Sequence, residues 1–95
     1  MSLDAIFKFR LYVAGSAETS TQAISNLTAL CRQHLPNRHQ IEIVDVFRDP
    51  VRAMADGVLM TPMLMKLAPV PTRRIVGSLS QEMVLLHTLG LVAGA

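Results

Sequence analysis

Apolar residues recur with two different spacings in the first half of the chain. Residues 6–13 alternate between the two faces of an extended chain, with the two-residue period of a β-strand. Residues 19–35 carry apolar side chains at steps of three and four, which predicts a helix with one apolar face. Thr19 and Gln22 have the spacing of a capping box, so we expect the helix to begin at Thr19. Residues 41–47 are apolar on both faces, as in a strand covered on two sides, and a strand–helix–strand unit makes its two strands parallel.

The middle of the chain predicts a short helix and then a third strand. Asp49 is placed to cap the helix, Pro50 fits its first position, and Gly57 is suited to end it. Residues 58–66 predict a strand that contains Pro62. Because proline has no backbone N–H to donate within a sheet, we expect Pro62 at the start of this strand or in a bulge.

The last part of the chain predicts a loop, a strand and a helix. Residues 67–72 form a proline-containing loop, residues 73–76 a short fourth strand, and residues 81–92 a final helix. Ser78 and Gln81 again have capping-box spacing. The resulting order βαβαββα, with a proline at the entry to the third strand, is the thioredoxin-like α/β plan.

Two segments in the second half are also compatible with other structures. Residues 84–92 lack a clean polar face, and from Leu86 onward they have the pattern of a strand as well. Residues 60–68 suit a helix equally, with Thr61 as its N-cap and Pro62 in its first position. A sequence whose local preferences disagree specifies a single structure less strongly.

The composition is that of a folded domain. The 95 residues are 51% hydrophobic and 17% charged, which excludes intrinsic disorder. We expect residues 1–95 to form one domain whose apolar surface is partly covered by another subunit. The net charge is only +2, and the chain has 3 Phe and 1 Tyr. It therefore lacks the clustered basic and aromatic residues that are typical of nucleic-acid-binding proteins. No apolar stretch suits a membrane span and no signal-peptide pattern begins the chain, so we expect a cytoplasmic protein.

Few residues offer the chemistry of an active site. Thiol–disulfide exchange needs a low-pKa thiolate, usually at a helix N-terminus, and a second thiol. Residues 15–20, which precede and open the first helix, contain no cysteine, and the single cysteine, Cys31, falls on the apolar face of that helix. His34 and His39 are five residues apart with a proline between them, unlike a helical metal-binding pair. We therefore expect an inert, buried Cys31, no enzyme activity, no metal and no cofactor.

Three basic residues surround the proline-containing loop: Lys66, Arg73 and Arg74. If the third and fourth strands pair, these cations gather at one side of the sheet. They form either an ordinary solvated surface or an electrostatic docking patch for an acidic partner, where such charges contribute on-rate and specificity more than affinity.

Several short motifs follow one another at a fixed spacing between Phe9 and Leu91. They read Leu-Tyr-Val-Ala-Gly at 11–15, Ile-Val-Asp-Val at 43–46 with Asp-Pro at 49–50, Thr-Pro at 61–62, Pro-Thr-Arg-Arg-Ile-Val-Gly at 71–77, and Leu-Ser at 79–80. In this order they resemble the circadian clock protein KaiB family over nearly the whole chain. The family's Gly-Asp-Leu-Ser-Asp motif reads Gly-Ser-Leu-Ser-Gln at 77–81, so both of its acids are missing.

The resemblance implies a regulator and not an enzyme. Members of the family bind the ring of the ATPase and autokinase KaiC, capture KaiA, and compete with a sensor histidine kinase. The resemblance also implies fold switching: the KaiC-binding monomer is thioredoxin-like, whereas the free protein is a tetramer with the order βαββααβ, which we expect of the free chain. Residues from Met60 onward, whose local preferences disagree, lie in the half that changes.

The resemblance also implies roles for individual residues. Lys66, Arg73, Arg74 and Tyr12 match positions of the family's partner-binding surface. The positions that match its conformational switch are Pro62, Pro69, Pro71, Gly77, Ser78 and Gln81.

Two other functions stay open at the level of sequence. One is a KaiB-like sensory or protein-interaction module related to the input domain of a histidine kinase, or a binder of small ligands. The other is a KaiB homologue with a role in stress regulation and without a clock. The departures from the family pattern in the 77–81 motif are compatible with this second role.

Overall fold

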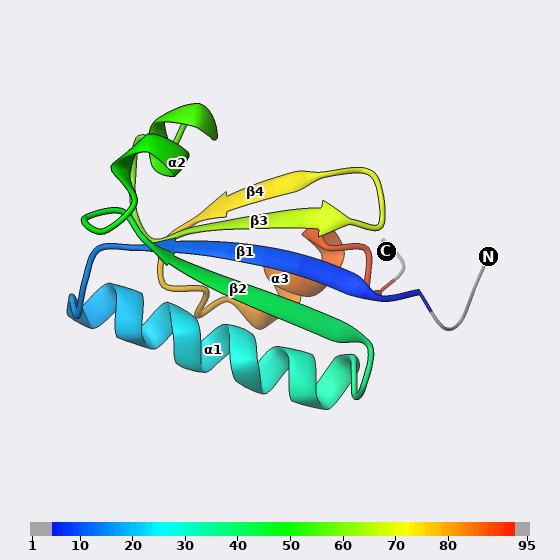
Figure 1. The fold of residues 1–95 in the computed structure, drawn as a ribbon. Helices are drawn as coiled ribbons and strands as arrows, with labels where there is room; N and C mark the ends of the chain where they lie inside the picture. The colour runs from blue at the N-terminus through cyan, green and yellow to red at the C-terminus, as the bar shows by residue number, and fades with distance from the viewer. Residues whose placement is uncertain (1–4, 93–95) are drawn as a thin grey trace.

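A computed structural model describes residues 5–92 of the chain (Figure 1). Its elements are β1 (Phe7–Val13), α1 (Glu18–His34), β2 (His39–Asp45), α2 (Pro50–Ala55), β3 (Met63–Ala68), β4 (Arg73–Val76) and α3 (Glu82–Thr88). This order confirms the predicted βαβαββα, thioredoxin-like α/β fold. The βαββααβ order expected of a free tetramer is not the order of this single chain, and it stays a prediction about the oligomer.

The four strands form one mixed sheet in the order β2-β1-β3-β4. β1 and β2 are parallel, from Phe7 beside His39 to Val13 beside Asp45, as predicted for the βαβ unit. β3 runs antiparallel to β1, and β4 runs antiparallel to β3. Helices α1 and α3 lie on one side of the sheet, and α2 lies at one end of its other side (Figure 1).

Strand β1 contributes side chains to a core on each face of the sheet. The larger core, under α1 and α3, is built from Phe7, Phe9, Leu11, Val13, Ala23, Leu27, Leu30, Cys31, Leu35, Leu64, Leu79, Leu85, Leu86 and Leu89. The smaller core, under α2, is built from Tyr12, Val44, Ala53, Met63 and Met65. The two-residue period of the strand explains this division, because successive side chains point to opposite faces.

Both predicted capping boxes are wrong. Helix α1 begins at Glu18 after Ala17, and no side chain caps it. The hydroxyl of Ser20 instead accepts a hydrogen bond from the backbone N–H of Ala14 at 3.1 Å, which ties the helix to the preceding turn. Gln81 is the residue before α3 and makes no side-chain cap. This helix also ends at Thr88, short of the predicted residue 92, and the chain then turns through Gly90 at φ +77°.

The second and third strands are both displaced from their predicted ranges, since β2 covers His39–Asp45 and not 41–47, and β3 covers Met63–Ala68 and not 58–66. β2 is an edge strand, so Ile43 is 47% exposed and the predicted cover on both faces is absent there. β3 begins at Met63 and not at residue 58, because Pro62 directly before it has no N–H to enter the ladder. The prediction that Pro62 lies at the strand start is therefore confirmed.

A network of ionic side chains attaches α2 to the sheet. Arg10 on β1 bonds through Nε to Glu42 Oε1 at 2.8 Å and through Nη1 to Asp56 Oδ2 at 2.9 Å. Arg52 on α2 bonds to the same Glu42 carboxylate at 2.9 Å. The buried hydroxyl of Tyr12 donates to Asp56 and lies 3.2 Å from the carbonyl oxygen of Arg52.

These contacts favour the charged form of both acids. The hydrogen bond from Tyr12 is the largest contribution to the lowered pKa of Asp56, and that from Arg10 is the largest contribution for Glu42. Since both pKa values lie below their ordinary values of about 4, the network stabilises the fold fully above about pH 4. That stabilisation is lost as the pH falls through the lowered pKa values.

We predict that Tyr12→Phe lowers the free energy of unfolding by about 1–2 kcal/mol, because it removes a hydrogen bond to a carboxylate. We expect Asp56→Asn to destabilise the protein at pH 7, and we expect this destabilisation to shrink as the pH falls through the lowered pKa of Asp56, below which Asp56 is protonated in both states. Urea unfolding of each variant at several pH values measures this. The control is Glu18→Gln, an exposed acid outside the network. A pH dependence unchanged by Asp56→Asn would contradict the assignment.

Candidate functional site

The loop between β1 and α1 leads into the N-terminus of a helix, a position where a cysteine thiol would have a lowered pKa and be reactive. Residues 14–17 form this loop and contain no cysteine. Cys31 lies in the larger core, fully buried, and burial raises the pKa of its thiol to about 11. The predicted buried position of Cys31 is thus confirmed. Within residues 5–92 no group of three His, Cys, Asp or Glu side chains is placed to hold a metal ion.

We predict that Cys31 does not react with alkylating reagents in the native protein at pH 8, because it is inaccessible and stays a thiol. In urea the same reagent is expected to modify it completely. Mass spectrometry of samples quenched over time measures both rates. Native-state alkylation as fast as that in urea would show that Cys31 is exposed.

The predicted basic cluster is divided between the two faces of the sheet. Lys66 on β3 is opposite Arg73 on β4, and Met65 is opposite Arg74. Opposite residues of an antiparallel pair share a face. Lys66 and Arg73 therefore face the side of α1 and α3, whereas Arg74 faces the side of α2.

Two of the expected partner-binding residues are buried in this structure. Lys66 is only 4% exposed, its Nζ donates to the carbonyl oxygen of Leu89 at 3.2 Å, and it lies 5.6 Å from the ring centre of Phe7. Burial is the main cause of its lowered pKa, and the nearby charge of Arg73 adds to it. Tyr12 is buried in the network described above. Arg73 and Arg74 are exposed, so they are the members of the predicted set that a partner can reach.

Arg74 extends the basic surface toward α2. Its Nη1 lies 3.6 Å from the point where a Cβ on Gly57 would be, at the end of α2. Gly57 itself has φ +68°, a left-handed conformation that favours glycine. A side chain at this position would therefore meet both the backbone strain and the Arg74 guanidinium.

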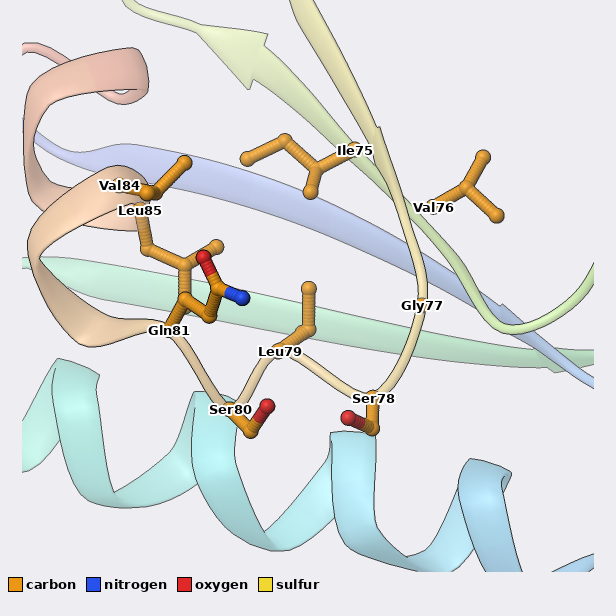
Figure 2. Close-up of a pocket in the computed structure, with 9 residues that line it drawn as sticks. All are labelled: Ile75, Val76, Gly77, Ser78, Leu79, Ser80, Gln81, Val84 and Leu85. Carbon is orange, nitrogen blue, oxygen red and sulfur yellow. The ribbon is translucent and has the colours of Figure 1, made fainter.

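Three of the predicted switch residues meet in a groove between β4 and α3 (Figure 2). The groove has a volume of about 350 Å³ and is lined by residues 75–81 with Val84 and Leu85. Gly77 has φ +119° and Leu79 has φ +63°, although Leu79 carries a Cβ and its side chain is buried. The carbonyl of Ser78 accepts a hydrogen bond from the Asn26 side chain at 2.8 Å, which fixes the loop on α1. The loop is thus held in a backbone conformation that non-glycine residues disfavour.

The three predicted switch prolines lie at two ends of the sheet. Pro62 is beside Gly77, whose N–H donates to its carbonyl oxygen at 2.9 Å. Pro69 and Pro71 lie in the turn between β3 and β4, at the far end of those strands. The peptide bonds before all three prolines are cis. The structure therefore brings Pro62 and Gly77 together and keeps the other two prolines apart from them.

An exposed apolar surface at the α2 end was not predicted from the sequence. Its residues are Phe47, Val51, Met54, Leu59 and Met60, and we call it the α2 apolar surface. All five are at least 65% exposed, and Phe47, Leu59 and Met60 line one pocket of about 220 Å³. The ring of Phe47 also covers Gly15 in the β1–α1 loop. The sequence did contain a signal, because Leu59 and Met60 precede a proline that a strand interior excludes.

Comparison with known families identifies the protein family of this chain. Residues 10–91 match the KaiB domain family. The chain belongs to the KaiB family. The circadian clock protein KaiB3 of Synechocystis is 41% identical over 83 residues, which are 87% of this chain and 81% of that protein. The circadian clock oscillator protein KaiB of Synechococcus elongatus is 34% identical over 94 residues, which are 99% of this chain and 92% of its own length.

Solved structures share the fold of this KaiB-family chain at low sequence identity. The N-terminal domain of SasA from Synechococcus elongatus matches with a TM-score of 0.74 and 15% identity, over 100% of this chain and 93% of that domain. Chloroplastic thioredoxin z matches with a TM-score of 0.76 and 15% identity, over 97% and 82% of the two chains. These likenesses show the thioredoxin-like fold. No helix in residues 5–92 is long and apolar enough to cross a membrane.

Proposed function

We propose that this chain is a non-enzymatic regulator that binds a KaiC-type ATPase ring and modulates its phosphorylation or its output signalling. The family match over residues 10–91 carries the proposal. The missing thiol in the β1–α1 loop supports a binding role on a thioredoxin-like scaffold. KaiA or a sensor histidine kinase is proposed as a further partner, and the cytoplasm as the location.

The exposed residues of the α2 end and of β4 form the proposed docking surface. Protein interfaces combine an apolar centre with a polar rim in which arginine is enriched. The α2 apolar surface offers such a centre, and the Arg74 guanidinium lies near Gly57, just after the end of α2. Arg73 follows on the same edge strand. Their charges favour an acidic partner surface and speed its association.

We predict that Arg74→Glu, and more strongly the double variant with Arg73→Glu, weakens ring binding by ~tenfold or more, about 1.4 kcal/mol. Both side chains are exposed, so the variants should keep the circular dichroism and melting temperature of the parent. The matched control is Arg32→Glu, an exposed arginine on α1, which lies on the other side of the sheet from α2 (Figure 1).

Co-elution and surface-binding kinetics with the KaiC-type ATPase of the same genome measure this effect. The loss is expected mainly in the association rate and is expected to shrink at high salt. Equal binding by the parent and the double variant would exclude the β4 arginines from the interface.

We also propose that the βαβαββα arrangement is the ring-binding form and that the free chain forms a homo-oligomer, a dimer or a tetramer with the rearranged order. The left-handed backbone of Leu79 supports this, since a residue with a Cβ pays about 1–2 kcal/mol for that conformation. The exposed α2 apolar surface supports an oligomer, because large apolar patches mark interaction sites. A switch needs two states within a few kcal/mol and a partner that prefers one of them.

We predict that adding the ring partner converts an oligomeric, rearranged population into thioredoxin-like monomers bound to the ring. Sedimentation of the free chain over a range of concentrations and NMR spectra with and without the ring measure the conversion. A free chain that is already monomeric and gives the same spectrum before and after binding would contradict the switch but leave ring binding intact.

A further inference from the structure

A cavity of about 550 Å³ lies at the end of the sheet away from the α2 apolar surface. Its lining residues come from the start of β1, the end of α1, the turn between β3 and β4, and the residues after α3. Its walls are mainly apolar and include Phe7, Leu35, Pro69 and Leu89. Cavities of this size, apolar with a few polar groups, are typical of sites for small ligands.

One wall of this cavity holds a buried cation, Lys66, that has no ion-pair partner within residues 5–92. Lys66 lines it and is 4% exposed. Its ammonium has three N–H groups, of which one is used by the carbonyl oxygen of Leu89 at 3.2 Å. None of the ion pairs within residues 5–92 involves Lys66. A buried charge is costly unless an opposite charge or further hydrogen bonds compensate it, so this position favours an anion.

The other charged groups at the cavity reinforce the preference for an anion. Arg38 lines it, and its Nε makes only a long contact of 3.4 Å with the carbonyl oxygen of Ala5. His34 lines it as well and is already paired with Glu82 at 3.2 Å. Within residues 5–92, the opening thus carries a guanidinium with donors beyond this one contact, and Glu82 is engaged by His34.

We propose that this cavity binds a small amphipathic carboxylate, such as a medium-chain fatty acid. Its carboxylate accepts hydrogen bonds from Lys66 Nζ, with Arg38 adding charge at the opening. Its apolar chain packs against Phe7, Leu35 and Leu89. The site lies at the end of the sheet away from the α2 apolar surface, and Arg73 of the proposed docking surface is opposite Lys66 across β3 and β4. The proposal does not depend on ring binding.

The test is a titration of the full chain with sodium octanoate, followed by calorimetry and by amide shifts in NMR spectra. We expect saturable binding at sub-millimolar concentration, with shifts concentrated at residues 5–7, 34–38, 66–71 and 89–91. Because a ligand draws the population toward the form it binds, binding is detected even from a mixture of two arrangements.

The charge requirement is tested with variants and with a neutral ligand. Lys66→Met keeps an apolar stem and is expected to weaken octanoate binding by ~tenfold or more, the loss of one buried ionic hydrogen bond. Lys66→Arg should retain most of the affinity, and Arg38→Met should lose severalfold. Octanol, which has no charge, should bind the parent and Lys66→Met equally. The control is Lys8→Met, an exposed lysine on β1.

Three results would overturn the proposal. One is the absence of saturable octanoate binding. Another is binding by Lys66→Met as tight as that of the parent. The third is an identical response to inorganic phosphate alone, which would make the site a plain anion site without a role for its apolar walls. If Lys66→Met fails to fold, Arg38→Met and the comparison of octanoate with octanol decide the question.

Discussion

The antiparallel pairing of β1 with β3 is the contact on which the rest of the structure depends. β1 is the one strand that takes part in both the parallel βαβ unit and the antiparallel second half. Its alternate side chains fill the core under α1 and α3, while Tyr12 fills the core under α2. Removing this pairing would separate β3 and β4 from the sheet and open both cores at once.

The same pairing decides which residues of the second half are available to a partner. Because Phe9 is opposite Lys66 across the two strands, Lys66 is directed into the layer under α1 and α3. Met65, which precedes Lys66 in β3, points to the opposite face, toward α2. Arg74 is opposite Met65 on β4 and shares that face. Arg74 is therefore presented on the face of α2, whereas Lys66 and Arg73 lie on the face of α1 and α3, where Lys66 lines a cavity.

Much of the fold could be predicted because hydrophobic periodicity is a local signal. The alternation of β1, the apolar stripe of α1 and the absence of an N–H in Pro62 were enough to place those elements in order. The capping boxes were wrong because helix boundaries depend on packing beyond the local sequence: α1 begins at Glu18, so Thr19 lies inside its first turn, and Gln81 itself is the residue before α3. Ile43 is exposed because β2 lies at the edge of the sheet. The order of the strands depends on the whole chain, so the sequence of β2 alone could not predict this exposure.

The site was less predictable than the fold. The exposed positions of Arg73 and Arg74 agree with the expected surface, but the burial of Tyr12 and Lys66 depends on which face each strand residue occupies. That face is set by register, and a shift of one residue reverses it. The α2 apolar surface was missed because Leu59 and Met60 were assigned to a strand interior.

The most direct test of the account is to observe strand pairing in the ring-bound chain by NMR of methyl-labelled leucine and isoleucine. The account predicts through-space contacts between the methyl groups of Leu11 and Leu64 and between those of Leu64 and Ile75, which are opposite each other across β1, β3 and β4. A bound chain in which Leu64 contacts neither Leu11 nor Ile75 would contradict it.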